Sequence, residues 1–326
     1  MAEADSPEPR LLIIDTDPGV DDAMAILMAA NSPEVRLIGI TTVYGNVPTA
    51  LATQNALRLV EMAGWAHQDV PVAQGAARSL KAGTDMERIA DFVHGADGFG
   101  DVGLPPPRGS PADCSAAEFI VRTVNAHPGR VTVLALAPLT NIAQALMLDP
   151  ALGNKWAELV VLGGAFFTNG NVNPSAEANI FGDPDAADLV LGATPRLRVL
   201  GLDVTTHCRL SGADLEALKG RGRFGSFVRD ISQFYLGFHK EWYDLDGIML
   251  HDPTAMAAVL RPELFEWRSG AVRVACEGVT KGHTVMDASP KGFHGHHGWA
   301  ERPRVQVALG ARREEVVELI RQRLTA

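Results

Sequence analysis

Short apolar runs alternate with longer stretches of helical spacing along most of the chain. The first run, 11–14, is uninterrupted and stops at Asp15, which is typical of a parallel strand buried on both faces. The expected strands are 11–14, 35–42, 131–135, 159–162 and 197–202. The expected helices are 23–30, 50–63, 116–126, 140–148, 184–191, 254–260 and 312–324. This alternation predicts an α/β fold with an open, mostly parallel sheet flanked by helices.

Several boundaries of these elements have a local cause. Asp22 is expected to cap the helix 23–30. Gly64 is expected to end the helix 50–63. The last helix is amphipathic and is expected to dock on the sheet. Two stretches, 163–179 and 278–303, lack this periodicity and are predicted to be long loops. We expect residues 10–326 to form a single domain after a disordered lead-in, residues 1–9.

Composition narrows the class of protein. The net charge is −10, so phosphate backbones repel the chain and nucleic acid is not an expected partner. The sequence lacks an apolar run of membrane-spanning length, and its polar start lacks the features of a signal peptide. The three cysteines are far apart and predict neither a disulfide framework nor a zinc site. We therefore expect a cytoplasmic protein with reduced, buried thiols and no membrane partner.

Four carboxylates crowd the loop that follows the first strand: Asp15, Asp17, Asp21 and Asp22, around a Pro-Gly turn. In an open α/β sheet, ligands bind at the carboxyl ends of strands. Carboxylates this close repel one another, and their hard oxygens favour calcium or magnesium over zinc. The alternative is that the last two aspartates only cap a helix, which is the commoner role for a single aspartate.

Other polar blocks are candidate parts of the same site. His251 and Asp252 follow an apolar patch and begin a helix, where they form either a helix cap or a metal ligand beside a proton donor. The amides and carboxylate of 171–179 suit a polyhydroxylated ligand such as a sugar, or else form Asx turns on the surface. Asn46 follows the second strand, and His94 lies in a glycine-rich segment.

Together these blocks resemble the inosine-uridine preferring nucleoside hydrolases. The similar blocks, in the family's order, are Asp-Thr-Asp-Pro-Gly-Val-Asp-Asp at 15–22, Thr-Thr-Val-Tyr-Gly-Asn at 41–46, Pro-Leu-Thr-Asn at 138–141, Gly-Gly at 163–164, Ala-Glu-Ala-Asn at 176–179 and His-Asp-Pro at 251–253. The stretches 91–98 and 170–179 are most like the plant-type uridine, inosine and xanthosine ribohydrolases. The resemblance covers about residues 10–320 and implies a Rossmann-like sheet.

The resemblance also implies a reaction and a set of roles. Ribonucleosides would be hydrolysed at the N-glycosidic bond by a calcium-activated water, in purine and pyrimidine salvage. Asp17 would be both metal ligand and general base, and the Ca²⁺ shell would be completed by Asp22, Asp252 and the carbonyl of Leu136. His251 would be the acid that protonates the leaving base. The residues expected at the ribose or the base are Asp21, Asn46, His94, Asn171, Glu177, Asn179, His239 and Tyr243. The enzyme would be a homo-oligomer, a dimer or a tetramer.

Some features stay open at this level. His239 and Tyr243 stand where such enzymes vary, so they lie either near the base or on a core-facing helix. The histidines at 294, 296 and 297 match none of the blocks and form either a transition-metal site or a disordered loop. Base preference depends on a few side chains and is not fixed by the sequence.

Two other functions compete with the hydrolase. A phosphatase of the haloacid-dehalogenase type also begins with a strand and Asp-x-Asp, but here Pro18, Gly19 and Val20 follow the second aspartate. A nucleoside-binding protein without activity would have lost the base or the metal ligands, which this chain retains.

Overall fold

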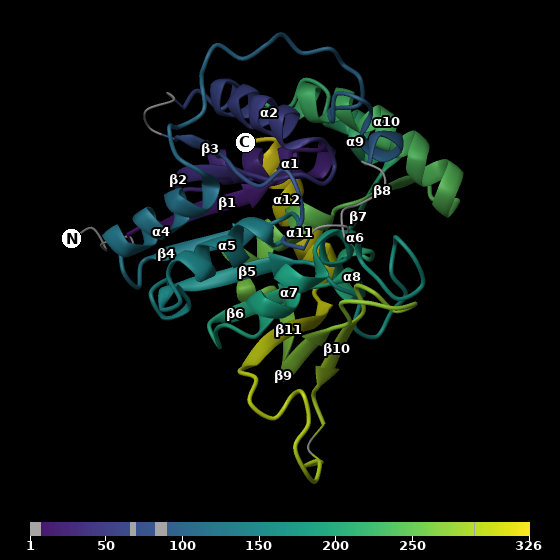
Figure 1. The fold of residues 1–326 in the computed structure, drawn as a ribbon. Coiled ribbons are helices and arrows are strands. Elements are labelled where there is room, and N and C mark those ends of the chain that lie inside the picture. The colour runs from purple at the N-terminus through teal and green to yellow at the C-terminus, as the bar shows by residue number, and fades with distance from the viewer. Residues whose placement is uncertain (1–7, 66–69, 82–89, 290) are drawn as a thin grey trace, which may run out of the picture.

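The computed structural model describes residues 8–65, 70–81, 90–289 and 291–326. Nine strands form one sheet: β1 Arg10–Thr16, β2 Val35–Thr42, β3 Val72–Gln74, β4 Val131–Ala135, β5 Glu158–Leu162, β6 Leu197–Leu200, β9 Phe265–Val274, β10 Thr284–Asp287 and β11 Arg304–Ala311. Their order is β10-β9-β11-β6-β5-β4-β1-β2-β3, and β9 is antiparallel to both of its neighbours while the others are parallel (Figure 1). The predicted α/β class with a mostly parallel sheet is confirmed.

The helices flank this sheet. They are α1 Val20–Ala30, α2 Thr49–Met62, α3 Asp91–His94, α4 Ala116–Ala126, α5 Thr140–Leu148, α6 Ala178–Gly182, α7 Pro184–Leu191, α8 Leu202–Thr205, α9 Gly212–Ala217, α10 Gly225–Tyr243, α11 His251–Leu260 and α12 Arg313–Leu324. Two short strands, β7 Arg209–Ser211 and β8 Gly247–Met249, form a separate antiparallel pair. Two 3₁₀ turns lie at Leu152–Asn154 and Pro262–Leu264.

The strand order creates a crevice beside β1. From β3 to β6 the spatial order is 3-2-1-4-5-6, so the direction of winding reverses between the neighbours β1 and β4. The loops after these two strands turn to opposite faces of the sheet and leave a gap at its carboxyl edge. Ligands of doubly wound sheets bind in that gap, and the acidic loop begins there.

Both faces of the sheet are buried, each in its own apolar core. Leu12 and Ile14 of β1 belong to the core that includes α1, α2, α10, α11 and α12. Leu11 and Ile13 belong to the other, with α4, α5 and α7, which lie in front of the sheet in Figure 1. Successive side chains of a strand point to opposite faces, so a doubly covered strand must be apolar throughout.

Three details differ from the expectations. The N-cap of α1 is Gly19 and not Asp22, because the helix starts directly after the Pro-Gly turn; Asp22 is its third residue and accepts from the Gly19 N–H. Helix α12, expected to dock on the sheet, packs mainly on α1 and α11. The supposed loop 278–303 contains the edge strand β10.

Other expectations have simpler outcomes. Residues 1–7 of the expected lead-in lie outside the described residues. The three cysteines are free, but only Cys208 is buried. The described residues contain no helix that combines the length and apolarity needed to cross a membrane. The single-domain assignment stays a prediction.

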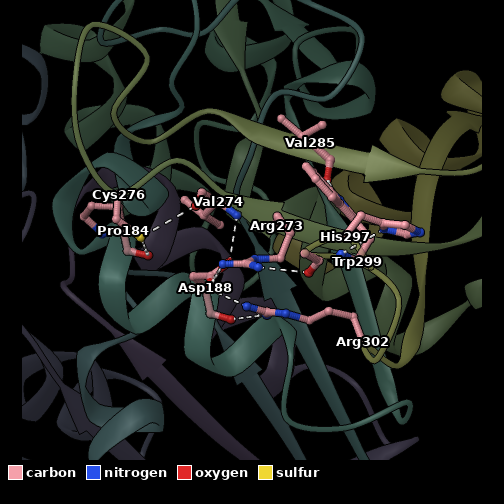
Figure 2. Close-up of polar contacts among 10 residues, drawn as sticks. Pro184, Asp188, Arg273, Val274, Cys276, Val285, His297, Trp299 and Arg302 are labelled. Carbon is pink, nitrogen blue, oxygen red and sulfur yellow. Dashed lines mark hydrogen bonds and ion pairs between the residues drawn. The ribbon is translucent and has the colours of Figure 1, made fainter. Parts of the chain in front are cut away.

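One ionic cluster joins α7 to the antiparallel edge of the sheet (Figure 2). The Asp188 carboxylate accepts hydrogen bonds from Nε and Nη2 of Arg273, at 2.9 and 3.1 Å, and from the backbone N–H of Val274 at 2.9 Å. Arg302 donates to the same carboxylate and to the Asp188 carbonyl. Asp188 and Arg302 are only 14% and 16% exposed at the side chain, so these bonds are shielded from water.

The same cluster anchors the histidine-containing segment after β10. Arg273 donates through Nη1 to the carbonyl of Gly298 at 2.9 Å, and the Trp299 indole donates to the carbonyl of Val285 at 3.1 Å. Among the described residues, the histidines at 294–297 belong to no group of three metal-ligating side chains. The transition-metal alternative therefore gains no support.

We expect Asp188→Ala to lower the free energy of unfolding by about 2 kcal/mol, because two half-buried guanidinium groups and one N–H lose their shared acceptor. Urea denaturation followed by circular dichroism measures this change. The matched control is Glu216→Ala, which removes an exposed partner of Arg229 and should hardly move the midpoint. Equal effects of the two substitutions would show that the cluster does not stabilise the edge.

Candidate active site

Three carboxylates from distant parts of the chain meet at the crevice beside β1. One oxygen each of Asp21, Asp22 and Asp252 lies within 4.8 Å of the others, and each residue is at most 5% exposed. Asp21 and Asp22 come from the first turn of α1, and Asp252 comes from the first turn of α11. The acidic loop and the His-Asp block, which were expected to be parts of one site, thus lie together.

Asp17 is held beside this group by Asn46. Its Oδ2 accepts a hydrogen bond from the Asn46 backbone N–H at 2.6 Å, and the Asn46 side-chain amide donates to Asp22 Oδ2 at 2.9 Å. Gly45 makes the close approach possible, because a Cβ there would lie 1.9 Å from Asp17 Oδ2. Asn46, expected near the sugar, therefore also bridges two of the carboxylates.

Asp15 serves a different network. Its Oδ1 accepts hydrogen bonds from the Thr41 hydroxyl of β2 and from the Asn141 side chain of α5, the latter at 2.8 Å. Burial raises the pKa of Asp15 to about 7, although both hydrogen bonds oppose that shift. Asp15 thus ties β1 to its neighbours beneath the site and does not join the group of three carboxylates.

Burial and mutual repulsion dominate the electrostatics of the acidic group. Burial, followed by the charge of Asp22, raises the pKa of Asp21 to about 7 and that of Asp17 well above its ordinary value. Burial and the charge of Asp21 raise the pKa of Asp252 in the same direction. A set of buried carboxylate oxygens with the nearby Leu136 carbonyl fits a hard divalent cation, which would remove this repulsion.

A cavity of about 970 Å³ opens above the acidic group. Its lining includes these expected residues: Asp21, Asn46, His94, Leu136, Asn171, Glu177, Asn179, His239, Tyr243, His251 and Asp252. Asp17 and Asp22 do not line it and lie behind Asn46, which contacts both. The structure therefore gathers the expected residues around one space, whereas their individual roles stay predictions.

The polar side of the cavity is built on α6. The Glu177 carboxylate caps this helix, accepting from the backbone N–H groups of Asn179 and Ile180 and from that of Gly164 at the end of β5. Asn179 in turn donates through its side-chain amide to the Leu136 carbonyl at 2.8 Å. These bonds fix the carboxylate and the amide at the rim, where they face the cavity.

An aromatic wall forms another part of the lining. We use this name for Phe92, Tyr235, Phe238, His239, Trp242 and Tyr243, all of which line the cavity. Tyr235, His239 and Tyr243 are four residues apart on α10, and their successive ring centroids lie 4.3 and 5.6 Å apart. The other four rings were not among the expected residues, although aromatic residues at i, i+4 spacing share one helix face and could have revealed Tyr235.

The hydrogen-bond partners of two cavity histidines define their tautomers. His94 Nδ1 accepts from the Val20 backbone N–H at 3.2 Å, so the neutral ring carries its proton on Nε2. His239 has Nδ1 2.9 Å from the Tyr235 carbonyl and accepts from the Met249 N–H through Nε2. Both nitrogens of His239 are therefore engaged with the backbone, so this ring offers packing and not a proton to a ligand.

His251 is also neutral. Burial lowers its pKa to about 3, and His239 contributes further in the same direction. A ring with this pKa is uncharged near pH 7. The role of His251 as the acid stays a prediction. Its Nδ1 lies 2.8 Å from the Thr205 hydroxyl, a contact that no sequence motif indicated.

The site thus combines a buried, cation-seeking acidic group with polar and aromatic walls at the switch point of a doubly wound sheet. This arrangement defines an enzyme that holds a small molecule, part polyhydroxylated and part flat ring, against a metal ion. The chain belongs to the inosine-uridine preferring nucleoside hydrolase family, whose sequence profile matches residues 12–318.

Individual relatives agree with this assignment. Uridine nucleosidase 1 of Arabidopsis thaliana is 47% identical over 96% of this chain and 92% of its own length. The pyrimidine-specific ribonucleoside hydrolase RihA of Klebsiella pneumoniae is 37% identical over 96% and 97% of the two chains. Among solved structures, a plant nucleoside hydrolase, the PpNRh1 enzyme, superposes with a TM-score of 0.94 at 46% identity, covering 98% of this chain and 99% of that one.

The protein is therefore a nucleoside hydrolase, an enzyme that cleaves the N-glycosidic bond of ribonucleosides with water. This family is metal-dependent. A phosphatase and a nucleoside-binding protein without activity are both set aside by these matches. A purine-preferring ribonucleoside hydrolase from Gardnerella vaginalis is also similar, with a TM-score of 0.88 at 32% identity over 97% and 98% of the two chains, so the fold alone does not fix the base.

We expect calcium to raise the melting temperature, and to do so more at pH 8 than at pH 5.5. A carboxyl group whose pKa is raised on folding, as from 3.8 to about 7 for Asp21, stabilises the protein at low pH, and this contribution is lost as the pH rises through the raised value. The metal-free protein thus loses stability between pH 5.5 and pH 8, whereas a bound cation favours the ionised carboxylate.

Calorimetric scans with calcium or with a chelator at each pH measure this difference. Groups that titrate identically in both samples cancel, so the comparison isolates the acidic group. Asp252→Asn should lose most of the calcium-induced shift. An equal shift at both pH values would contradict the assignment of the raised pKa values to a cation site.

Proposed function

We propose that this enzyme hydrolyses uridine to uracil and ribose with one bound Ca²⁺, and that it accepts inosine and xanthosine as further substrates. The observation that supports it best is that a buried acidic group and an aromatic wall border one cavity. The acidic and amide side suits ribose, and the aromatic side suits a flat base. The identity of 47% with a uridine nucleosidase favours uridine as the first substrate.

Asp17 is the proposed general base. The Asn46 N–H fixes its carboxylate, and its raised pKa makes it a stronger base than an exposed aspartate. It would take a proton from the water that attacks the anomeric carbon, while the base leaves with the electrons of the glycosidic bond. Asp17, Asp22, Asp252 and the Leu136 carbonyl would hold the cation. When bound, Ca²⁺ supplies Lewis-acid activation of the attacking water and positive charge near the ribose hydroxyls.

The polar wall is proposed to hold the sugar. Asp21, Asn171, Glu177 and Asn179 line the cavity and offer the acceptors and donors that ribose hydroxyls need. Glu177 also places negative charge where the oxocarbenium-like sugar develops positive charge. Its attachment to three backbone N–H groups keeps that charge in a fixed place during the reaction.

The aromatic wall and the remaining histidines are proposed to hold the base. Tyr243, 44% exposed at the mouth, and His239 beneath it present stacked rings to a flat ligand. His94 offers its Nε2–H from α3, which packs beside α10, and His251 adjoins the cation site. We further propose a cytoplasmic homo-oligomer, a dimer or a tetramer, that acts in nucleoside salvage.

A reducing-sugar assay across uridine, inosine, xanthosine, adenosine and cytidine tests the function. We expect uridine to have the highest kcat/KM, a chelator to abolish release of ribose, and calcium to restore it better than magnesium. Failure to release ribose from any of the five would overturn the proposed function. A clear preference for a purine would overturn only the choice of uridine.

We expect Asp17→Asn to lower kcat by roughly 10²–10⁴-fold, the range for a lost general base, because an amide cannot accept the proton of the water. The substitution keeps the shape of the side chain, and its hydrogen bond from Asn46 can still be accepted by the amide oxygen. Steady-state kinetics with uridine measure kcat, and circular dichroism controls for folding. A kcat near that of the parent enzyme would assign the base to another residue.

A further inference from the structure

Thr205 touches the one cavity histidine whose tautomer the backbone does not set. It is the last residue of α8 and is completely buried, and its hydroxyl oxygen lies 2.8 Å from Nδ1 of His251. His94 and His239 both meet a backbone group at Nδ1, which fixes where their protons lie. For His251 the position of the ring proton depends on a side-chain hydroxyl, which can either donate or accept.

The direction of the Thr205–His251 hydrogen bond follows from which arrangement leaves no buried donor without an acceptor. If the hydroxyl donates to Nδ1, its only proton is used and the ring acceptor is satisfied. If it instead accepts an Nδ1–H, the hydroxyl proton of a fully buried residue has no other acceptor among its bonds in the described structure. The neighbouring Thr206 shows the usual alternative, a bond to the carbonyl four residues earlier, that of Leu202 at 2.7 Å. An unused buried donor is costly, so donation by Thr205 is favoured.

We infer that Thr205 is a positioning residue that donates its hydroxyl proton to His251 Nδ1 and thereby places the ring proton on Nε2. The inference rests on the proposed function, because its consequence is a neutral Nε2–H at the cavity beside Asp252. That N–H donates a hydrogen bond to the departing base and stabilises the negative charge which the base acquires with the glycosidic electrons. The ring need not be an imidazolium for this role.

Three variants separate this role from packing. Thr205→Val keeps the size of the side chain and removes the hydroxyl, whereas Thr205→Ser retains the hydroxyl with a smaller side chain. Thr206→Val is the matched control, since it removes a hydroxyl that bonds only to the helix backbone. Each is assayed with uridine and with nitrophenyl riboside, whose leaving group needs little stabilisation. Both substrates carry the same ribose, so effects on sugar binding cancel.

We expect Thr205→Val to lower kcat for uridine by about 10-fold to 100-fold with little change in KM, and to spare nitrophenyl riboside. Thr205→Ser should restore most of the rate, and Thr206→Val should leave it unchanged. In a His251→Ala background, Thr205→Val should have no further effect on uridine, because the hydroxyl acts through the ring. Equal slowing of both substrates, or a full effect without His251, would overturn the inference.

A direct readout does not depend on activity. A long-range ¹H–¹⁵N spectrum of the parent protein in calcium-containing buffer reports which imidazole nitrogen is protonated, and His251→Ala assigns the signals. The expected pattern is a bare Nδ1 and a protonated Nε2, and a protonated Nδ1 would overturn the inference. If the parent enzyme hydrolyses uridine but has a protonated Nδ1, only the inference is overturned and the proposed function stands. Parent enzyme inactive on every nucleoside would instead remove the function on which the inference rests.

Discussion

The burial of several carboxylates at one point is the constraint on which the rest of this structure depends. Asp21, Asp22 and Asp252 lie within a few ångströms of one another with almost no access to water. Such charges persist together only if a cation or protons compensate them. The glycine at position 45, the Asn46 bridge and the gap at the switch point all serve to hold this group without filling the space where an ion and a sugar would sit.

The histidines of the cavity are uncharged, which limits what they can do to a leaving group. Burial depresses the pKa of both His94 and His251, and the nitrogens of His239 are used by the backbone. The site therefore combines an acidic group with rings that donate or stack without charge. In the proposed mechanism, fixed N–H groups stabilise the departing base, and no titrating acid is needed.

Much of the fold followed from periodicity, because β1, β2 and the helices on either side are simple in pattern. Site residues could be predicted from the sequence where a motif follows the end of a strand, as in the acidic loop. What the sequence could not show was pairing across the chain. Asn46 bonds to two carboxylates, Asp15 turns away into the sheet, and Thr205 reaches His251 from another helix. Each depends on a side-chain direction that only tertiary packing decides.

The place of β11 in the sheet has a consequence for how the enzyme is made. This strand, almost the last element of the chain, pairs with β6 and separates it from β9, which precedes it in sequence. In a nascent chain that has emerged only as far as β10, the β9–β10 hairpin lacks the strand that joins it to β6, and α12 is not yet present to cover α1 and α11. The sheet can therefore be completed only after β11 has been made, through contacts of high sequence separation. Synthesis cut short would leave an apolar sheet edge exposed, which makes such fragments targets for quality control.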